Sequence, residues 1–386
     1  MASSNRVLFL AERTAIPDGQ IDPHGSSVHV AATLFALRER FDVLALGAAP
    51  GTTAQAAPRL LRSLFPARVR GLRRDVGYLC EDRAFYARAL KAARSFRPDV
   101  VYMRDEYFTF AGLRLARRVG VPFVLEVNGL LELDARTMYR SLGEPIGGWI
   151  ERIKLARADA IVVETSGLAE HLEERGAPRS RLFVVPNTVS DARVAAEPRA
   201  RRAERVVIGW IGHLMAWHAD SLMTLADVAR RVVDEADVRF LIVGDGPRLD
   251  EVRDRVHALG LDARFEFTGS VPYEDVPRAL EAVDVAVIPD VFDYAFPVKL
   301  VEFGAAGIPV VMQRGASLDT LLEPNVEYLP FDRNDPDGLH NALLRIVRDD
   351  ELRVSLAAAL HRAVRERFTW SVAANKLEAV VLRVLR

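Results

Sequence analysis

The segment from Tyr294 to Val311 combines one lysine and one glutamate with the signals of a helix start. Pro297 suits the first helical turn, where its missing amide would be unpaired, and the free amides beside it favour a bound phosphate. Lys299 and Glu302 are three residues apart, so a helix places them on one face. The pair suits a nucleotide, with the lysine near the diphosphate and the carboxylate near the ribose hydroxyls. The alternative is an ordinary helix with a solvated Lys/Glu pair.

Polar and small residues follow the first expected strand of each half of the chain. In the second half, His213 and His218 could donate hydrogen bonds to phosphate, and a protonated histidine could offset charge on a leaving group. Two incidental surface histidines are the alternative. In the first half, Gly25 and Ser26 precede a helix expected from about Val28, and small residues there let an anion approach closely. A plain helix N-cap is equally compatible with that pattern.

Motifs of several other enzyme classes are incomplete or absent from the sequence. The GxG at Gly244 to Gly246 lacks the third glycine of a dinucleotide fingerprint and indicates a tight turn. The sequence contains no P-loop, GxSxG elbow or HExxH motif. Asp335-Pro336-Asp337 precedes a helix expected at Gly338–Val347 and indicates capping rather than metal binding. Cys80 is the single cysteine, which excludes a disulfide framework or a cysteine metal cluster.

Composition indicates a globular protein of two domains. The chain has 386 residues, 50% hydrophobic and 27% charged, with a net charge of -1. This balance provides no overall attraction to nucleic acid or to an anionic membrane. The N-terminal apolar run lacks a basic leader and a cleavage site, and no window approaches 18 uninterrupted apolar residues. We therefore expect a cytoplasmic protein.

Short apolar strands alternate with amphipathic helices in both halves, as in parallel sheets covered on both faces. We predict an α/β fold with two doubly wound domains. The expected strands are Val7–Leu10, Phe41–Leu46, Val100–Met103, Phe123–Val127, Ala160–Val163, Leu182–Val185, Val206–Ile211, Val238–Val243, Arg264–Thr268, Val285–Ile288 and Pro309–Met312.

The expected domain boundaries follow from composition. Residues 1–190 form the first domain, 191–205 an Ala/Arg/Glu-rich linker and 206–368 the second domain. A closing helix over 369–386 is expected to pack back on the first domain. Ligands of such sheets bind beyond the carboxyl ends of the strands, and with two domains we expect them in the cleft between.

The order and spacing of these features resemble the GT4-type glycosyltransferases, retaining nucleotide-sugar enzymes with the GT-B fold of two Rossmann-like domains. The resemblance covers nearly the whole chain. Its marks are the glycine loop at Gly25, Pro98–Tyr102, Val121–Gly129, Pro186–Val189, Gly209–Gly212, Ile242–Pro247, Phe267–Gly269, Asp284–Pro289, the Tyr294–Val311 segment and Trp370.

The resemblance implies roles for individual residues. Glu302 matches the second glutamate of the family's E-x7-E motif, which holds the donor ribose, whereas Tyr294 stands where the first glutamate contacts the donor sugar. His213 and His218 stand in place of the family's basic pair, and Lys299 is expected to supply the missing permanent charge.

Further positions carry over in the same way. Asn128 stands where many members have a histidine near the reacting sugar, and it can bind a hydroxyl but cannot shuttle a proton. Thr188 replaces a usual glycine, which argues against a left-handed backbone there. The remaining expected donor-binding positions are Phe296, Pro297, Val298, Gly25, Ser26, Gly212, Gly244, Gly269 and Val271.

The function implied is transfer of a sugar from a nucleotide-diphosphate sugar to a hydroxyl acceptor, with retention of anomeric configuration. The acceptor would be a natural-product scaffold, a glycan or a lipid-linked sugar. No residue is an obvious covalent nucleophile, so we expect a front-face displacement in which a diphosphate oxygen takes the acceptor proton. No cofactor and no metal are expected, because Lys299 and helix amides fill the cation's place.

Two alternatives remain open from the sequence. The changes at Tyr294, His213 and His218 would also suit a non-catalytic nucleotide-sugar-binding homologue or a partner subunit. A sugar-nucleotide epimerase on the same fold would use acid/base groups such as Glu126 and Glu132, which are also the candidate acceptor-side residues.

A basic segment stands in the first half. Arg59 to Arg74 interleaves arginines with Leu, Phe and Val, and could face an anionic lipid, a phosphorylated acceptor or solvent alone. Weak contact with a membrane surface is therefore one expectation. No nucleic-acid reader motif is present, and no pattern indicates an oligomeric state.

Overall fold

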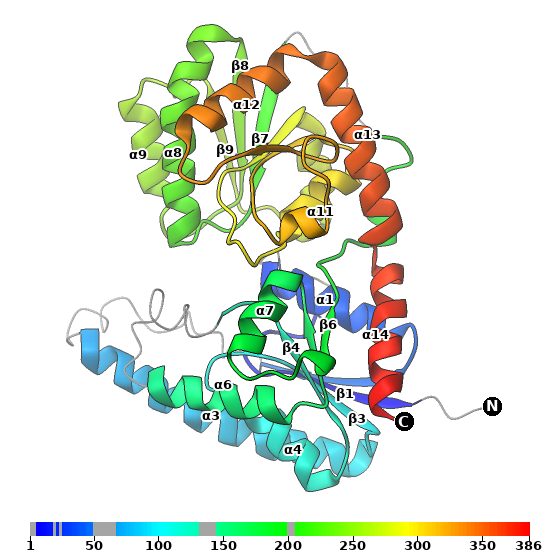
Figure 1. Ribbon diagram of the computed structural model, residues 1–386. Coiled ribbons are helices and arrows are strands. Elements are labelled where there is room, and N and C mark those ends of the chain that lie inside the picture. The colour runs from blue at the N-terminus through cyan, green and yellow to red at the C-terminus, as the bar shows by residue number, and fades with distance from the viewer. Residues whose placement is uncertain (1–4, 18–20, 23–24, 49–66, 131–143, 199–204) are drawn as a thin grey trace. The chain divides into compact units, whose positions relative to one another are not determined.

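The computed structural model describes residues 5–17, 21–22, 25–48, 67–130, 144–198 and 205–386. The chain divides into two compact units, each built around its own sheet (Figure 1). Unit 1 contains Met1–Ile16, Thr33–Pro186 and Ala373–Arg386, and unit 2 contains Pro17–Ala32 and Asn187–Val372. The chain thus crosses between the units at Pro186, not at 190, and the described part of the expected linker belongs to unit 2.

Unit 1 is a six-stranded parallel sheet in the order β2-β1-β3-β4-β5-β6. Its strands are β1 Arg6–Ala11, β2 Asp42–Gly47, β3 Val100–Arg104, β4 Phe123–Val127, β5 Ala160–Val163 and β6 Leu182–Val184. Its helices are α3 Ala67–Phe96, α4 Ala111–Val119, α6 Glu144–Arg157, α7 Ser166–Glu174 and most of α14 Trp370–Val384, while α1 Gly25–Arg38 is shared with unit 2.

Unit 2 is also a six-stranded parallel sheet, in the order β12-β11-β10-β7-β8-β9. Its strands are β7 Val206–Ile211, β8 Val238–Val243, β9 Phe265–Gly269, β10 Val285–Ile288, β11 Val310–Gln313 and β12 Leu329–Phe331. Its helices are α8 Ala216–Glu235, α9 Leu249–Ala258, α10 Val276–Ala279, α11 Val298–Ala305, α12 Pro336–Arg348 and α13 Asp350–Arg367.

The predicted fold class is confirmed, and several strand bounds agree to the residue. Phe123–Val127, Val206–Ile211 and Val238–Val243 are predominantly apolar runs, and all three form strands over those residues. The strand Leu329–Phe331 was missed, because it is three residues long, contains a proline and lies at the edge of the sheet, where proline is tolerated.

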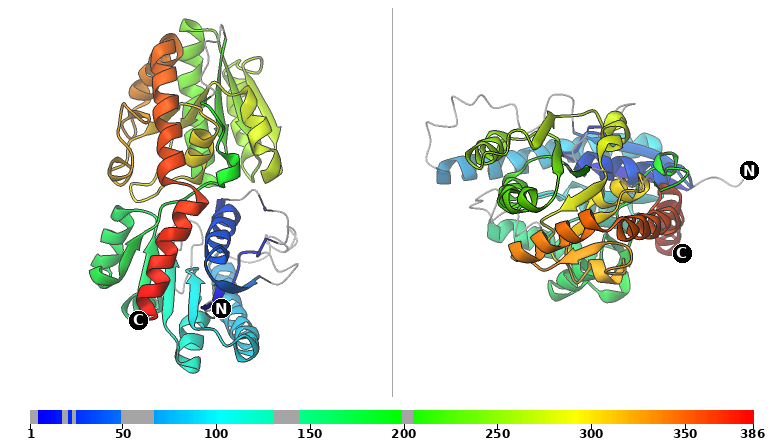
Figure 2. Two further views of the ribbon diagram at one scale, coloured as in Figure 1. Left: turned by 90° about the vertical axis from the view of Figure 1, so that its right-hand side faces the viewer. Right: turned by 90° about the horizontal axis from the view of Figure 1, so that it is seen from above.

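Unit 2 has a hydrophobic core on each face of its sheet. Side chains alternate along each strand, so Phe240 and Val285 pack with α8, α9 and α12, whereas Leu241 and Ala286 pack with α10, α11 and α13. Helices accordingly lie on both sides of these strands (Figure 2). None of the described helices is long and apolar enough to cross a membrane.

A repeated aspartate ties neighbouring strands together. Three aspartates that directly precede a strand accept a hydrogen bond from a backbone amide at the start of the adjacent strand. They are Asp99, bonded to the Arg6 amide at 2.7 Å, Asp159, bonded to the Phe123 amide at 2.8 Å, and Asp284, bonded to the Val207 amide at 2.9 Å. The Pro-Asp and Asp-Val marks in the sequence therefore have a structural role, since each carboxylate pairs an amide that the sheet leaves unpaired.

The Asp284→Ala substitution should destabilise unit 2. It leaves the Val207 amide without its carboxylate partner in a buried setting, and such a loss costs about 1–3 kcal/mol, which lowers the melting temperature by roughly 3–10 °C. Thermal unfolding followed by circular dichroism measures the shift. Asp262→Ala is the control, because Asp262 is exposed and, among the described residues, its carboxylate bonds His257 on the same surface. Equal melting temperatures for the two variants would contradict the role of Asp284.

Candidate functional site

Lys299 presents an uncompensated positive charge at the start of α11. Its Nζ lies 4.1 Å from the centre of the buried Trp210 ring, and a Cβ placed on Gly212 would lie 3.0 Å from it. Within the described ranges, no hydrogen bond or ion pair engages this Nζ. Burial lowers the pKa of Lys299 to about 7, against the opposing charge of Asp290. An anion that binds here could bond the Lys299 ammonium directly, because no carboxylate of the described residues bonds it.

The topology of unit 2 places this lysine where ligands of such sheets bind. From β7 the chain builds outward through β8 and β9, and then returns to build β10, β11 and β12 on the other side of β7. We call the space beyond the carboxyl ends of β7 and β10 the switch point of unit 2; a crevice there is the usual ligand site. Gly212 follows β7, while Asp290 and then Lys299 follow β10.

Glycines let the strand ends of β7, β8 and β9 approach one another closely. Gly212, Gly244 and Gly269 have φ angles of 149°, 141° and 71°, which other residues rarely adopt. A Cβ on Gly244 would lie 1.9 Å from the Gly212 carbonyl oxygen, and the Gly244 amide donates to the Gly269 carbonyl at 3.0 Å. These three predicted donor-binding positions therefore form one contiguous backbone surface beside Trp210.

The predicted charge on His218 is wrong. Its Nδ1 lies 2.6 Å from the His213 carbonyl oxygen and its ring packs edge-on against Trp210. Burial, with the charge of Lys299, lowers the pKa of His218 to about 3, so the imidazole is neutral at physiological pH. His218 therefore supports Trp210 and the loop at His213 and adds no positive charge, which leaves Lys299 as the cation of this cluster. The sequence does not reveal the burial that causes this.

Glu302 is the centre of a buried network. Tyr273 donates its hydroxyl to Glu302 Oε1 at 2.7 Å, and Arg193 donates to Oε2 at 3.1 Å. The Arg193 guanidinium also lies 3.5 Å from the centre of the Tyr273 ring. Burial raises the pKa of Glu302, while Arg193 and the Tyr273 hydroxyl oppose the rise. Sequence reasoning missed both partners, because Arg193 stands in the expected linker and Tyr273 in a loop of no recognised motif.

Asn187 holds the turn that precedes α11. Its Oδ1 lies 2.5 Å from His29 Nδ1 on α1, and its Nδ2 donates to the Phe296 carbonyl. The Pro186–Val189 mark thus positions the start of α11 and with it Lys299. The φ angle of Thr188 is not positive, which agrees with the prediction made from threonine standing in place of the usual glycine.

The aromatic residues before α11 are core residues rather than open donor contacts. Phe296, a predicted donor-binding position, is 1% exposed and its ring packs on Phe368, so its side chain belongs to the core. Tyr294 is buried and stacks on Phe292. Pro297 is the N-cap, one residue before the first helical position expected for it, and its side chain makes no capping hydrogen bond.

The remaining donor candidates differ in exposure. Val298 and Val271 are partly buried against the core of unit 2. Gly25 and Ser26 are exposed at the first turn of α1, which begins three residues before the expected Val28.

In unit 1, two predicted residues contact each other. Asn128 donates its side-chain amide to Glu126 Oε1 at 3.0 Å, and Tyr102 donates its hydroxyl to Glu126 Oε2 at 2.6 Å. Glu126 is 1% exposed, and its hydrogen bond orients Asn128 at the end of β4. Glu132 and the first half of the basic segment, residues 59–66, lie outside the described residues, and the second half begins α3.

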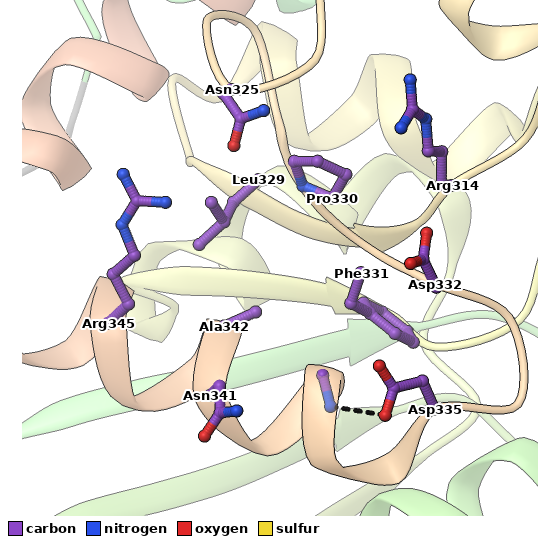
Figure 3. A pocket seen from close by; sticks show the side chains of 11 residues that line it. Arg314, Asn325, Leu329, Pro330, Phe331, Asp332, Asp335, Asn341, Ala342 and Arg345 are labelled. Atoms are coloured by element: carbon purple, nitrogen blue, oxygen red, sulfur yellow. Dashed lines mark hydrogen bonds between the residues drawn. The ribbon is translucent and has the colours of Figure 1, made fainter.

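A pocket of about 390 Å³ is lined by residues of β12 and α12, with Arg314 and Arg345 at opposite ends (Figure 3). None of the predicted site residues lines it. Asp335 at its margin accepts the Gly338 amide at 2.8 Å, which confirms that Asp335-Pro336-Asp337 is a helix cap. In the described part of the chain, no three His, Cys, Asp or Glu side chains converge as metal ligands.

Comparison with known proteins agrees with this geometry. Residues 23–193 match the model of Glycosyltransferase Family 4, and residues 205–349 match that of Glycosyl transferases group 1. The Streptomyces fradiae 2-deoxystreptamine N-acetyl-D-glucosaminyltransferase is 29% identical over 286 residues, 69% of this chain and 67% of that one. The Streptomyces kanamyceticus 2-deoxystreptamine glucosyltransferase is 31% identical over 264 residues, 61% and 66% of the respective chains.

The matches thus span about two thirds of the length of these relatives. Among solved structures, Anabaena HepE in complex with UDP and glucose superposes with a TM-score of 0.69 at 15% identity, covering 98% of this chain and 100% of that one. This likeness establishes the two-domain fold. The two family models, which together match most of the chain, show that it belongs to the GT4-type glycosyltransferases, and the likeness agrees with their GT-B fold.

Proposed function

We propose that the protein transfers a sugar from a nucleotide-diphosphate sugar to a hydroxyl acceptor, with retention of anomeric configuration and without a metal ion. The observation that carries the proposal is the Lys299 side chain at the switch point of unit 2, whose Nζ is bonded by none of the residues that the structure describes. A diphosphate is the ligand that suits it, because the start of α11 and the glycine backbone nearby also favour an anion.

Glu302 extends this site toward a ribose. It stands one turn further along α11 than Lys299, and the two side chains contact different partners. A carboxylate has about four lone-pair positions, so Glu302 can accept ribose hydroxyls while it keeps Tyr273 and Arg193. The existing hydrogen bonds hold the carboxylate in one orientation, which favours recognition of two adjacent hydroxyls.

The proposed reaction occurs on one face of the donor sugar. The bond from the anomeric carbon to the diphosphate oxygen breaks, the acceptor oxygen bonds to that carbon from the same side, and the departing oxygen takes the acceptor proton. Lys299 stabilises the charge that develops on the diphosphate. Asn128, held by Glu126, would orient a hydroxyl and would not move a proton.

A non-catalytic nucleotide-sugar binder is the second candidate. Tyr294 is buried at the position where the resemblance implies a donor-contacting glutamate. His218 is neutral at a position where it implies a positively charged residue. Calorimetric titration with UDP-, GDP- and ADP-sugars identifies the donor, and turnover of the bound sugar with acceptors then separates the two functions.

Lys299→Met should weaken donor binding about 10- to 100-fold, because a charge-assisted hydrogen bond contributes about 1.5–3 kcal/mol. Wild-type affinity for UDP-glucose, whose diphosphate does not titrate in this range, should be full below pH 7 and fall as the pH rises above the lysine's pKa of about 7. Lys299→Arg should abolish this pH dependence, since guanidinium stays charged.

Calorimetric titration between pH 6 and 9 measures both effects. Lys91→Met is the matched control, because Lys91 is exposed on α3 in unit 1. Unchanged affinity in Lys299→Met, or a wild-type affinity independent of pH, would contradict the role of Lys299.

Glu302→Gln should remove discrimination between UDP and 2′-deoxy-UDP. Wild-type protein should prefer UDP by roughly tenfold, because the carboxylate accepts a ribose hydroxyl that the deoxy compound lacks. Tyr273→Phe is the control for the network, since it removes one donor to Glu302 and keeps the charge. If Glu302→Gln keeps the preference for UDP, the carboxylate does not bind the ribose.

Donor binding should be equal in EDTA and in magnesium, because a lysine and backbone amides fill the place of the cation. Calorimetric titration with UDP-glucose in each buffer measures this. Binding that is lost in EDTA and restored by magnesium would overturn the metal-independent proposal.

A further inference from the structure

Unit 1 has its own switch point, and acidic residues follow both of its strands. The chain builds from β1 to β2 on one side and returns to build β3 to β6 on the other, so β1 and β3 are neighbours where the direction reverses. Glu12 directly follows β1, and Asp105 and Glu106 directly follow β3. As in unit 2, the carboxyl ends of these strands are the expected place for a ligand.

Glu12 is a buried carboxyl group that lacks a full set of partners. It is 5% exposed, and its Oε2 has no hydrogen-bond partner among the residues that the structure describes. Its Oε1 lies 3.4 Å from Arg13 Nη2, longer than an ordinary charge-assisted hydrogen bond. An unsatisfied buried carboxyl in a folded protein calls for a functional reason, since it costs stability.

The surrounding charges leave Glu12 short of positive charge. The Arg13 guanidinium is shared between Glu12 and Glu81, each at 3.4 Å, and also bonds the Tyr107 carbonyl. Glu106 accepts from neutral donors, the Arg13 amide and the Thr14 hydroxyl, both at 2.8 Å.

The other nearby acids have cations of their own. Lys154 bonds Asp105, and Arg114 bonds Asp82 at 2.7 Å. Within the described residues, Glu12 and Glu81 therefore divide one guanidinium between them, while Glu106 bonds neutral donors.

We infer that this switch point recognises a positively charged amino group of the acceptor, and that Glu12 Oε2 is the oxygen that accepts its hydrogen bond. The inference rests on the proposed glycosyl transfer and assigns it an amine-bearing, polyhydroxylated acceptor. A phosphorylated acceptor is disfavoured, because its charge would face Glu12, Glu81 and Glu106. Glu12 is a binding residue here and takes no part in bond breaking.

The proton balance makes the inference measurable. Burial, with the nearby Asp82, Glu106 and Glu81 and against Arg13, raises the pKa of Glu12 to about 8. The carboxyl is therefore mostly protonated at pH 7 in the free protein, and a bound ammonium favours its ionised form. Binding should release close to one proton to solvent, and affinity should rise as the pH increases from 6 to 8, where the free carboxyl begins to ionise.

The test is calorimetric titration of the UDP-loaded protein with 2-deoxystreptamine, which carries two primary amines, and with myo-inositol, which carries hydroxyls alone. Wild-type protein should prefer the amine, and titration at pH 7 in buffers of different ionisation enthalpy should show the released proton. Glu12→Gln should lower affinity for the amine about 10- to 100-fold, leave myo-inositol unchanged and abolish the proton release.

Two variants control for structure. Glu12→Asp keeps the charge on a shorter side chain and should retain part of the preference and the proton release, whereas Glu39→Gln changes an exposed carboxylate of the same unit and should alter nothing. Glu12→Gln should melt no lower than wild type, since it removes a buried acid that lacks partners.

Equal binding of amine and polyol, or proton release that persists in Glu12→Gln, would overturn the inference. UDP-glucose titration separates this failure from that of the proposed function. Donor binding without amine preference rejects the acceptor assignment alone, whereas absence of donor binding rejects the transferase proposal itself.

Discussion

A lysine ammonium packed against an indole ring, with no carboxylate bonded to it among the described residues, is the interaction on which the candidate site of unit 2 depends. Burying such a charge is unfavourable, and the depressed pKa of Lys299 expresses that cost. The surrounding structure maintains it. His218 supports Trp210 from its edge, Asn187 holds the turn before α11, and glycines at the strand ends keep bulk away from the ammonium. An anionic ligand would supply a negative charge in contact with the ammonium.

The two units share one sheet topology but have side chains of opposite charge at the switch point. Each sheet reverses its building direction beside its first strand, so each has a switch point at the carboxyl ends of two neighbouring strands. In unit 2 the group there is Lys299, and in unit 1 it is Glu12. Burial lowers the pKa of Lys299 and raises the pKa of Glu12, so that it favours the neutral form of each side chain. A donor with a diphosphate and an acceptor with an amine would each restore the charged form of its own site.

Sequence reasoning predicted those features that depend on local pattern. Predominantly apolar runs such as Val238–Val243 indicate buried strands, and the Pro297, Lys299 and Glu302 spacing identified the start of α11. It could not predict features that depend on burial or on distant contacts. The neutral state of His218 arises from packing against Trp210, and the partners of Glu302 come from segments more than 25 residues away in the chain. Glu12 belongs to no motif, and only its environment distinguishes it from an exposed glutamate.

The charge state of Lys299 is the most direct test of the account. The chain has four lysines, Lys91, Lys154, Lys299 and Lys376, so NMR of protein with carbon-13-labelled lysine yields few signals, and Lys299→Arg assigns the one that matters. The account predicts that this signal titrates near pH 7 in the free protein and at a higher pH once UDP-glucose is bound. Titration near the ordinary lysine value of about 10.4, unmoved by the nucleotide sugar, would contradict it.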